Sequence, residues 1–400
     1  MNLRVLHVVP SLDPRAGGVA EAVVQLVNHM LIYGCAGEVA SLDPPDAFVT
    51  ERVQGRVHRL GPGRGNYGLS LNALRWLRAH AGDYDAIVVH GIWQFHSIAA
   101  RYGAGRLRTP LFVFPHGMLD PWFQHTYPLK HWKKRIYWAL AERWLFSFAQ
   151  AVLFTCRTEL ELAREPFLDR RTPLEATGFG IAPPPDDAMA ATAFFDAYPT
   201  LRGKRILLFL SRIHEKKGCD LLVEAFSQVA FRHPNARLVI AGPGDDASLA
   251  AIDREVHARG IESQVVRTGM LTGALKWAAL RAAEVFVLPS HQENFGIAVV
   301  EAMASATPVI ITDRVNIWHE VAAAGAGLVV SDTLAGITAG ISRWCEVMEP
   351  ARIAVMRERA LACYHAHFRI EGAALKLVEL IAAACAADSA TVASPFGSRA

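Results

Sequence analysis

The stretch VFVLPSHQENFGIAVVEAMA, residues 285–304, begins with a run of four apolar residues, continues as a polar loop and ends as a second apolar segment. An apolar run without alternation is typical of a strand that is buried on both faces, as in a parallel sheet covered by helices. The second segment starts at Gly296 and is long enough for a helix. We therefore predict a strand, a loop and a helix, with the polar residues of the loop at the end of the strand.

The same pattern of a short apolar run followed by a helix-like segment recurs along the chain. The runs are 5–9, 87–89, 111–114 and 152–154 in the first half, and 206–210, 238–241, 265–266, 285–288, 309–311 and 328–330 in the second. Alternating strands and helices predict βαβ units and a doubly wound sheet. Because the runs form two groups, we predict an α/β protein with two Rossmann-like parallel-sheet domains that face a cleft.

A change of composition marks the boundary between these domains. The segment GFGIAPPP, residues 178–185, breaks the periodicity with residues that turn or stiffen a chain. We predict an N-terminal domain over 1–180, a linker over 181–203, a C-terminal domain over 204–352, helices over 353–385 that cross back to the first domain, and a disordered tail over 386–400.

Composition excludes several classes of protein. The 400 residues include 41 Lys and Arg against 38 Asp and Glu, a net charge of +3 that argues against binding of nucleic acid by the whole surface. The six cysteines form no C-x-x-C pair, which is typical of a reducing compartment and not of a disulfide scaffold. The first residues lack the pattern of a signal peptide, and no stretch is apolar enough to span a bilayer. We expect a cytoplasmic protein, with the inner face of the membrane as a second location.

Three cationic residues follow the apolar run 206–210, and for Lys216 we expect exposure to solvent. Arg212 and Lys217 would stand at the end of this strand, where an arginine fork, a lysine point charge and helix amides could hold a diphosphate. A solvated basic loop is the alternative. Gly242, in the turn after the next strand, would let the backbone approach a ligand closely.

The two glutamates of residues 285–304 form the strongest pattern. Glu293 lies in the loop and Glu301 about a turn and a half inside the helix, so a sugar and a phosphate fit between them. The first helix amides, at 295–297, carry partial positive charge. Glu301 has apolar neighbours on both sides, and a glutamate in such surroundings needs a partner.

In the first half, Gly17 and Gly18 open a helix after the first strand and leave its amides accessible to an anion or a polyol. The segment is not G-x-G-x-x-G, and no acidic ribose anchor follows at the expected distance. A dinucleotide-dependent dehydrogenase is therefore disfavoured.

The interval from Glu293 to Glu301 resembles the E-x7-E signature of the family 4 retaining glycosyltransferases, and residues 211–218 and 241–244 resemble the donor-phosphate loop and the glycine turn of that family. The resemblance implies a GT-B fold with an N-terminal acceptor domain and a C-terminal nucleotide-sugar domain. The residues that it implies in donor binding are Gly17, Gly18, Arg212, Lys217, Gly242, Thr268, Met270, Glu293, Asn294, Phe295, Gly296, Ile297 and Glu301. Among these, Arg212 and Lys217 would bind the diphosphate, Glu293 the transferred sugar, Glu301 the ribose, and the strand end at Thr268 and Met270 the base.

Histidines follow two strands of the first half. His116, in a His-Gly pair after the run 111–114, matches the same family, which implies contact with the transferred sugar near the reacting carbon. Together with Arg212, Lys217 and Glu293 it completes the set of candidate catalytic residues. Asp120 is a second polar candidate on the acceptor side. His90 could line the acceptor pocket or bond within its turn.

Residues 130–144 contain five Lys or Arg, one acidic residue and three tryptophans. Such a helix can pack its aromatic stripe into its own domain, or lie on an anionic membrane surface, which would suit a polyprenyl-linked acceptor.

We therefore expect a retaining hexosyltransferase that moves a sugar from a nucleotide diphosphate sugar to a hydroxyl of a glycan or glycolipid, in bacterial cell-surface polysaccharide or lipopolysaccharide synthesis. No D-x-D motif with an apolar lead-in is present, so we expect neither a metal nor another cofactor. The resemblance implies front-face attack, in which the leaving phosphate takes the acceptor proton. A nucleotide-sugar epimerase and a non-catalytic sugar-nucleotide-binding protein are the alternatives.

Overall fold

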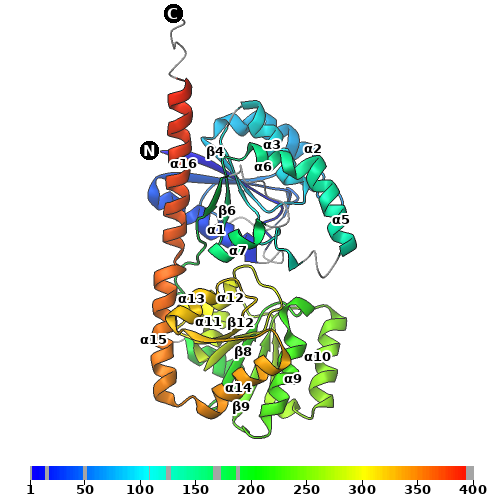
Figure 1. The fold of residues 1–400 in the computed structure, drawn as a ribbon, viewed down its shortest axis with the longest axis vertical. Helices are drawn as coiled ribbons and strands as arrows, with labels where there is room; N and C mark the ends of the chain where they lie inside the picture. Colours follow the sequence, from blue (N-terminus) through cyan, green and yellow to red (C-terminus); the bar gives the residue numbers. More distant parts are fainter. Residues whose placement is uncertain are drawn as a thin grey trace, which may run out of the picture. The chain divides into compact units, whose positions relative to one another are not determined.

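The computed structural model describes residues 2–13, 18–47, 52–107, 109–122, 128–164, 173–185 and 190–392 (Figure 1). The chain divides into two compact units: unit 1 comprises Met1–Ala182 and Ile370–Ala400, and unit 2 comprises Pro183–Arg369. Each unit is built around its own parallel sheet.

The sheet of unit 1 has, within the described residues, seven strands in the order β3-β2-β1-β4-β5-β6-β7. The strands are β1 (Leu3–Val9), β2 (Cys35–Ser41), β3 (Val57–Arg59), β4 (Ala86–His90), β5 (Leu111–Phe114), β6 (Ala151–Phe154) and β7 (Leu174–Ala176). The helices are α1 (Gly18–Met30), α2 (Leu71–His80), α3 (Phe95–Leu107), α5 (Pro128–Tyr137), the π-helix η4 (Trp138–Glu142), α6 (Arg143–Phe148), α7 (Arg157–Ala163) and α16 (Ile370–Val392).

Helices cover both faces of this sheet, because alternate residues of the buried strands point to opposite sides. In β1, Leu6 and Val8 belong to the core on the side of α2 and α3, whereas Leu3 and Val5 belong to the core to which α16 contributes Leu377. A strand whose residues are apolar without alternation thus contributes side chains to a core on each face of the sheet.

Unit 2 repeats the plan with six parallel strands among its described residues, in the order β10-β9-β8-β11-β12-β13. They are β8 (Arg205–Leu210), β9 (Ala236–Ala241), β10 (Val265–Gly269), β11 (Val285–Leu288), β12 (Val309–Thr312) and β13 (Gly327–Val330). The helices are α8 (Ala190–Ala197), α9 (Cys219–Ala230), α10 (Asp246–Ala258), α11 (Gly273–Ala282), α12 (Ile297–Ala304), α13 (Trp318–Ala324), α14 (Leu334–Val347) and α15 (Pro350–His367).

In both sheets the strand order reverses at the first strand, which is the topological switch point of the sheet. In unit 1, β1 lies between β2 and β4, and in unit 2, β8 lies between β9 and β11. The loops that leave two such neighbouring strands run to opposite faces of the sheet, which opens a crevice at the carboxyl ends where doubly wound folds bind ligands. The predicted fold class, with two doubly wound parallel sheets, is confirmed.

The division of the chain differs in detail from the predicted boundaries. The predicted linker 181–203 contains α8, which packs against α11 within unit 2. In the predicted C-terminal segment, α15 packs on α12 and α13 of unit 2, and α16 packs on α1 of unit 1. Since α16 continues to Val392, the part of the predicted disordered tail before residue 393 is helical. Residues 393–400 lie outside the described residues.

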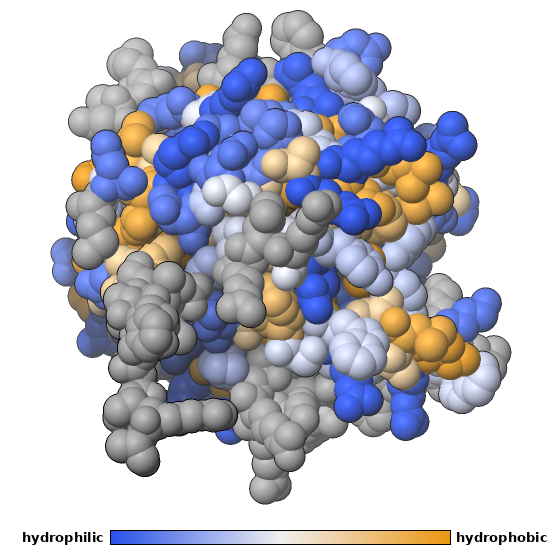
Figure 2. Space-filling view, turned by 90° about the horizontal axis from the view of Figure 1, so that it is seen from above, coloured by the Kyte–Doolittle hydropathy of each residue, from blue (hydrophilic) through white to orange (hydrophobic). Residues whose placement is uncertain are grey.

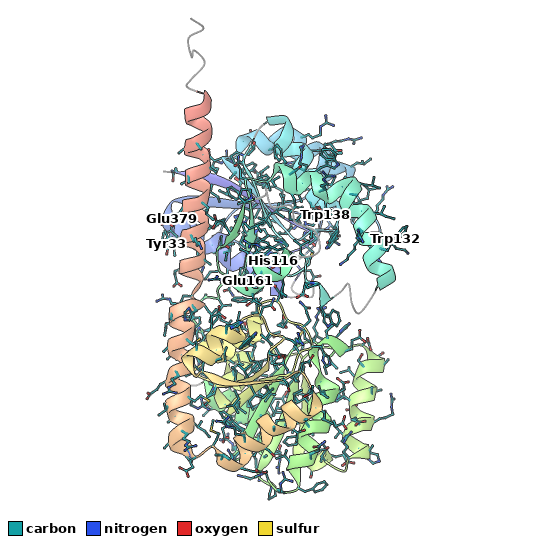
Figure 3. All side chains as sticks on the ribbon, in the orientation of Figure 1. Tyr33, His116, Trp132, Trp138, Glu161 and Glu379 are labelled. Atoms are coloured by element: carbon teal, nitrogen blue, oxygen red, sulfur yellow. The ribbon has the colours of Figure 1, made fainter. Side chains whose placement is uncertain are left out.

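The segment 130–144 is divided between burial and exposure. Tyr137 and Trp138 are partly buried, and their rings lie against that of Trp93. The side chains of Trp132, Ile136, Leu140 and Trp144, at intervals of four residues, are exposed. Figure 3 labels Trp132 on the outer side of α5 and Trp138 nearer the sheet. The hypothesis that the whole aromatic stripe packs into its own domain is therefore wrong for these four residues. None of the described helices is long and apolar enough to cross a membrane.

A buried carboxylate holds this segment to the end of β4. Glu142 accepts hydrogen bonds from the backbone N–H of Trp93 (2.7 Å) and the hydroxyl of Ser97 (3.0 Å). Its Oε2 has no hydrogen-bond partner among the described residues. Burial raises the pKa of Glu142 from 4.5 to about 7.

The raised pKa predicts a pH-dependent stability that Glu142→Gln removes. Between pH 4.5 and about 7 the folded chain keeps a proton that the unfolded chain has lost, so this group makes the wild type less stable as pH rises through that window. At about 1.4 kcal/mol per pKa unit, the free energy of unfolding of Glu142→Gln should exceed that of the wild type by up to ~3 kcal/mol more at pH 8 than at pH 4. Urea unfolding at both pH values measures the difference, and Glu161→Gln, an exposed carboxylate of α7, is the control. An equal effect of Glu142→Gln at both pH values would contradict the assignment.

Candidate active site

Backbone hydrogen bonds join the loops that follow β8 and β9. The N–H of Ser211 donates to the carbonyl of Ala241 (3.0 Å), and that of Ile213 donates to the carbonyl of Pro243 (2.8 Å). Gly242 has a φ of 143°, and a Cβ there would lie 1.8 Å from the carbonyl oxygen of Ser211. Only glycine fits at this position, and the close approach that it permits in the structure is between the two loops. The approach of a ligand to Gly242 stays a prediction.

The loops after β8 and β11 meet at the topological switch point of the unit 2 sheet. Gly218, with a φ of 63°, lies so close to the loop after β11 that a Cβ would be 2.2 Å from the carbonyl oxygen of Pro289. One residue earlier, the ammonium of Lys217 forms an ion pair with the carboxylate of Glu293. Two of the predicted residues, 76 positions apart in sequence, are therefore in direct contact.

The backbone of Glu293 is fixed to the loop after β12. Its N–H donates to the carbonyl of Arg314 (3.0 Å), and its carbonyl accepts from the N–H of Asn316 (3.0 Å). The side-chain nitrogen Nδ2 of Asn316 also lies 3.4 Å from Oδ1 of Asn294. Three loops thus determine where the carboxylate of Glu293 stands.

Glu301 lies inside α12 and is only 5% exposed. Its Oε1 is 2.6 Å from the ammonium of Lys276, which comes from α11 and lies over the ring of Trp277. The prediction that a glutamate among apolar neighbours needs a partner is confirmed. Lys276 itself was missed, because nothing in its own segment marks a lysine on an amphipathic helix as the partner of a distant carboxylate.

Helix α12 begins immediately after Gly296, which has a φ of 75°. Phe295 is buried and its ring meets that of Phe368 edge-on, with centroids 5.8 Å apart. This anchor turns the chain at Gly296, so the first helical amides, from Ile297 onward, start at the end of the loop that carries Glu293.

The other predicted donor residues lie at the same edge but are more open to solvent. Arg212 is exposed and, among the described residues, forms no ion pair. The hydroxyl of Thr268 donates to the carbonyl of Gly269 (3.1 Å), and the side chain of Met270 is exposed. The N–H of Gly242 donates to the same carbonyl of Gly269 (2.8 Å), which ties the end of β10 to this set of loops.

A histidine and an aspartate that the sequence analysis did not select lie beside this edge. His291 donates its backbone N–H to the carbonyl of Lys216 (2.9 Å), and its Nδ1 is 2.6 Å from a carboxylate oxygen of Asp332. The hydrogen bond to Asp332 raises the pKa of His291, so the ring takes up a proton more readily than an isolated histidine. Its position two residues before Glu293, in the same loop, was the available signal.

Three of the residues predicted in unit 1 are Gly17, Gly18 and Asp120. Gly17 lies outside the described residues, and Gly18 is the first residue of α1. Asp120 accepts a hydrogen bond from the N–H of Trp122 (2.8 Å), which caps a turn and leaves the side chain partly exposed.

His116 and His90 are in direct contact. Nε2 of His116 is 3.0 Å from Nδ1 of His90, and His116 has a φ of 52° at the end of the unit 1 sheet (Figure 3). The ring of His90 is fully buried, which places it behind His116 and not on the surface.

A buried glutamate in α7 holds the backbone next to His116. Glu159 accepts hydrogen bonds from the N–H of Gly117 (2.6 Å) and from both the N–H (2.8 Å) and the hydroxyl (2.6 Å) of Thr155. The sequence analysis missed this residue, whose partners belong to two different loops. Within the described parts of the chain, no group of three His, Cys, Asp or Glu side chains is disposed to hold a metal ion.

The chain contains two doubly wound units, and a Glu-x7-Glu segment lies at the topological switch point of the second sheet. These features define the class of GT-B glycosyltransferases. Comparison with known families supports this class. Residues 192–351 match the family described as glycosyl transferases group 1, and residues 17–174 match the glycosyl transferase 4-like domain. The chain belongs to family 4 of the glycosyltransferases.

Individual relatives are similar over part of their length. The chain is 28% identical over 265 residues to mannosylfructose-phosphate synthase of Agrobacterium fabrum, a match that covers 60% of this chain and 56% of that protein. It is 35% identical over 152 residues to phosphatidyl-myo-inositol mannosyltransferase of Mycobacterium tuberculosis, which covers 36% of this chain and 38% of that protein. The chain therefore matches between about a third and somewhat more than half of these relatives. Among solved structures, Anabaena HepE in complex with UDP and glucose superposes with a TM-score of 0.79 at 15% identity, over 95% of this chain and 100% of that chain.

The buried contact between Lys276 and Glu301 predicts a coupled pair. Lys276→Met should lower the stability of unit 2 by about 3 kcal/mol, because it leaves the carboxylate of Glu301 buried without its cation. The double variant Lys276→Met/Glu301→Gln should recover most of that loss, because no charge remains to be solvated.

Hydrogen exchange of α11 and α12 under increasing urea measures this cycle. Arg232→Met, which removes an exposed ion pair with Glu346, is the control and should cost less than about 1 kcal/mol. Additive effects of the two substitutions at 276 and 301 would contradict the coupling.

Proposed function

We propose that this protein is a retaining hexosyltransferase, which moves a hexose from a nucleotide diphosphate sugar to a hydroxyl group of a glycan or glycolipid. The observation that carries the proposal is the contact between Lys217 and Glu293. It joins the loops after β8 and β11 at the topological switch point of the unit 2 sheet. Membership of the family adds support, as do relatives named as a mannosyltransferase and a sugar-phosphate synthase. Cell-surface polysaccharide or lipopolysaccharide synthesis is the biological role that we propose for this reaction.

The proposed donor site assigns one chemical task to each charged residue. Arg212 and Lys217 bind the diphosphate, Glu293 accepts hydrogen bonds from hexose hydroxyls, and Glu301 accepts them from the ribose diol. The amides at the start of α12 add partial positive charge beside the phosphates. We propose that the backbone of the strand end at Thr268 and Met270 binds the base.

Binding of the donor would exchange partners within the ion pair of Lys217 and Glu293. The diphosphate carries more negative charge than a carboxylate, so it competes for the ammonium of Lys217. The carboxylate of Glu293 then becomes available to the hydroxyls of the sugar. The site would in this way prepare its sugar contact only when a diphosphate is present.

The chemistry needs a stabilised leaving group more than it needs a nucleophile on the protein. The glycosidic bond to the diphosphate breaks as the acceptor oxygen bonds to the same face of the sugar carbon, and the departing phosphate takes the acceptor proton. Fixed cations and helix amides stabilise the charge that develops on the diphosphate, because they are already oriented when the reaction begins. We propose that this happens without a metal ion, with Arg212 and Lys217 supplying the charge.

Titration with a panel of nucleotide sugars, followed by product analysis with and without acceptor, tests the proposal. Consumption of the donor only in the presence of acceptor, with unchanged anomeric configuration and full activity in a chelator, is the expected result. Isomerised donor without acceptor would indicate an epimerase, and binding without turnover a non-catalytic protein.

Arg212→Ala should weaken donor binding or transition-state stabilisation by about 1–3 kcal/mol, the value of a hydrogen bond to a charged group. Steady-state kinetics and calorimetry with the preferred donor measure this loss. Arg254→Ala, an exposed arginine of α10 in the same unit, is the control. Unchanged donor affinity and turnover in Arg212→Ala would remove this residue from the site.

A membrane-linked acceptor, such as a polyprenyl-linked glycan, is the acceptor class that we propose. Trp132, Ile136, Leu140 and Trp144 expose an apolar stripe, and Lys133, Arg135 and Arg143 are exposed on the same segment. In Figure 2, apolar side chains in orange lie beside blue hydrophilic ones at the right-hand edge, the side on which α5 lies in Figure 1. Aromatic and basic side chains on one helix are the combination that binds an anionic bilayer surface.

Vesicle binding tests this surface. Leu140→Ser should weaken binding to vesicles of phosphatidylglycerol and phosphatidylcholine about ten-fold, since a buried leucine contributes about 1.5–3 kcal/mol. Phe231→Ser is the matched control, because Phe231 in unit 2 has the same 74% exposure as Leu140. Equal binding of both variants and the wild type, or no preference for anionic lipid, would refute contact through this segment.

A further inference from the structure

Three histidines of unit 1 form a row of hydrogen-bonded imidazoles. Nε2 of His116 is 3.0 Å from Nδ1 of His90, and Nε2 of His90 is 3.0 Å from Nδ1 of His7. Successive rings are 5.3 Å apart and nearly parallel, with interplanar angles of 21° and 19°. The row connects the candidate sugar contact at His116 to the interior of the sheet.

Adjacent strands hold the three rings in place. His7 lies in β1, His90 ends β4 and His116 follows β5, and these strands are neighbours in the sheet. His7 and His90 are fully buried, whereas His116 is partly exposed. Burial lowers the pKa of His7 and of His116 to about 3, and it lowers the pKa of His90 as well, so all three rings are neutral near pH 7.

The backbone on either side of the row is also fixed. Nε2 of His96 lies 3.0 Å from the carbonyl oxygen of His90 and 3.1 Å from that of Gly91, so it carries the proton and donates to both. The N–H of Gly117 donates to Glu159 next to His116. The backbone at His90 and the backbone next to His116 are therefore both held in place by side-chain hydrogen bonds.

Neutral rings allow only two arrangements of protons along the row. Each imidazole has one N–H and one lone pair, and each contact needs one of each. Because His90 takes part in both contacts, its tautomer determines the other two. Either all three rings carry the proton on Nδ1, or all three carry it on Nε2.

The far end of the row decides between these arrangements. Nε2 of His7 is buried and has no hydrogen-bond partner among the described residues. If the rings carried their protons on Nε2, His7 would bury an N–H without an acceptor, which is unfavourable because the group loses its hydrogen bond to water. With the protons on Nδ1, only a lone pair is left without a partner, a more common situation for buried groups.

We propose that His7 and His90 are positioning residues that hold His116 in its Nδ1–H tautomer, so that His116 offers a neutral hydrogen-bond donor to an oxygen of the transferred sugar. The proposal rests on the function proposed above. In this arrangement Nε2 of His116 already accepts from His90, so the ring cannot take the proton of the acceptor there. The proton is then left to the departing phosphate, and no positive charge on His116 opposes the developing charge on the sugar carbon.

Nitrogen-15 NMR of the histidine side chains in the full-length protein, without donor or acceptor, tests the arrangement directly. Couplings of the ring nitrogens to the carbon-bound protons identify which nitrogen is protonated. We expect Nδ1–H for His7, His90 and His116, Nε2–H for His96, and no titration of the first three between pH 6 and 8. An Nε2–H tautomer, a mixture of tautomers, or a charged ring at His116 would overturn the proposal.

Variants at two positions link the tautomer to turnover. An asparagine places its amide where Nδ1 of histidine lies, so His116→Asn can still donate, whereas His116→Asp can only accept. We expect His116→Asp to lose at least about ten-fold more kcat than His116→Asn, the difference of one hydrogen bond. Equal losses, or higher activity of His116→Asp, would overturn the role as a donor.

At position 90, His90→Asn retains an N–H for Nε2 of His116 and His90→Leu removes it. We expect His90→Leu to lower kcat about ten-fold with an unchanged KM for the acceptor, and His90→Asn to recover most of that loss. Equal kcat in the two variants would overturn the positioning role. The NMR result separates the two proposals: an inactive protein with Nδ1–H at His116 contradicts the transferase alone, and an active one with Nε2–H contradicts the histidine row alone.

Discussion

The ion pair between Lys217 and Glu293 is the interaction on which the candidate donor site depends. It is available only because β8 and β11 are neighbours in the sheet although α9, β9, α10, β10 and α11 separate them in sequence. The glycine at 218 then lets the two loops approach to backbone contact. Parallel topology thus brings together a cation and a carboxylate that are far apart in sequence.

Unit 1 uses the same topology with a different kind of polar chemistry. At the topological switch point of its sheet, between β1 and β4, the uncharged rings of His7 and His90 are in contact. Charged groups could not be buried so deeply without partners, whereas neutral imidazoles satisfy one another in a chain. The edge of unit 2 therefore suits contact with anions, and the interior of unit 1 suits the orientation of one ring.

Most of the fold could be predicted because the central strands carry continuous apolar runs. The strands β2, β3 and β7 were not predicted: β2 includes Gly37 and Glu38, and β3 and β7 are three residues long. Glu301 could be recognised by its apolar neighbours, but its partner Lys276 could not, because the contact joins two helices. The same limit hid His7, which reads as a polar interruption of β1 until β4 is placed beside it.

The charges at the candidate donor edge are the reason why we propose a role in donor binding for the exposed Arg212. Lys217 forms an ion pair with Glu293, and Lys276 forms one with Glu301. In the proposed function, Lys217 therefore binds the diphosphate only after it gives up its contact with Glu293. Arg212, which forms no ion pair among the described residues, needs no such exchange, and the amides of α12 add partial positive charge. Since Arg212 need not abandon an ion pair, the attraction that we propose between it and a diphosphate would not be offset by a lost contact.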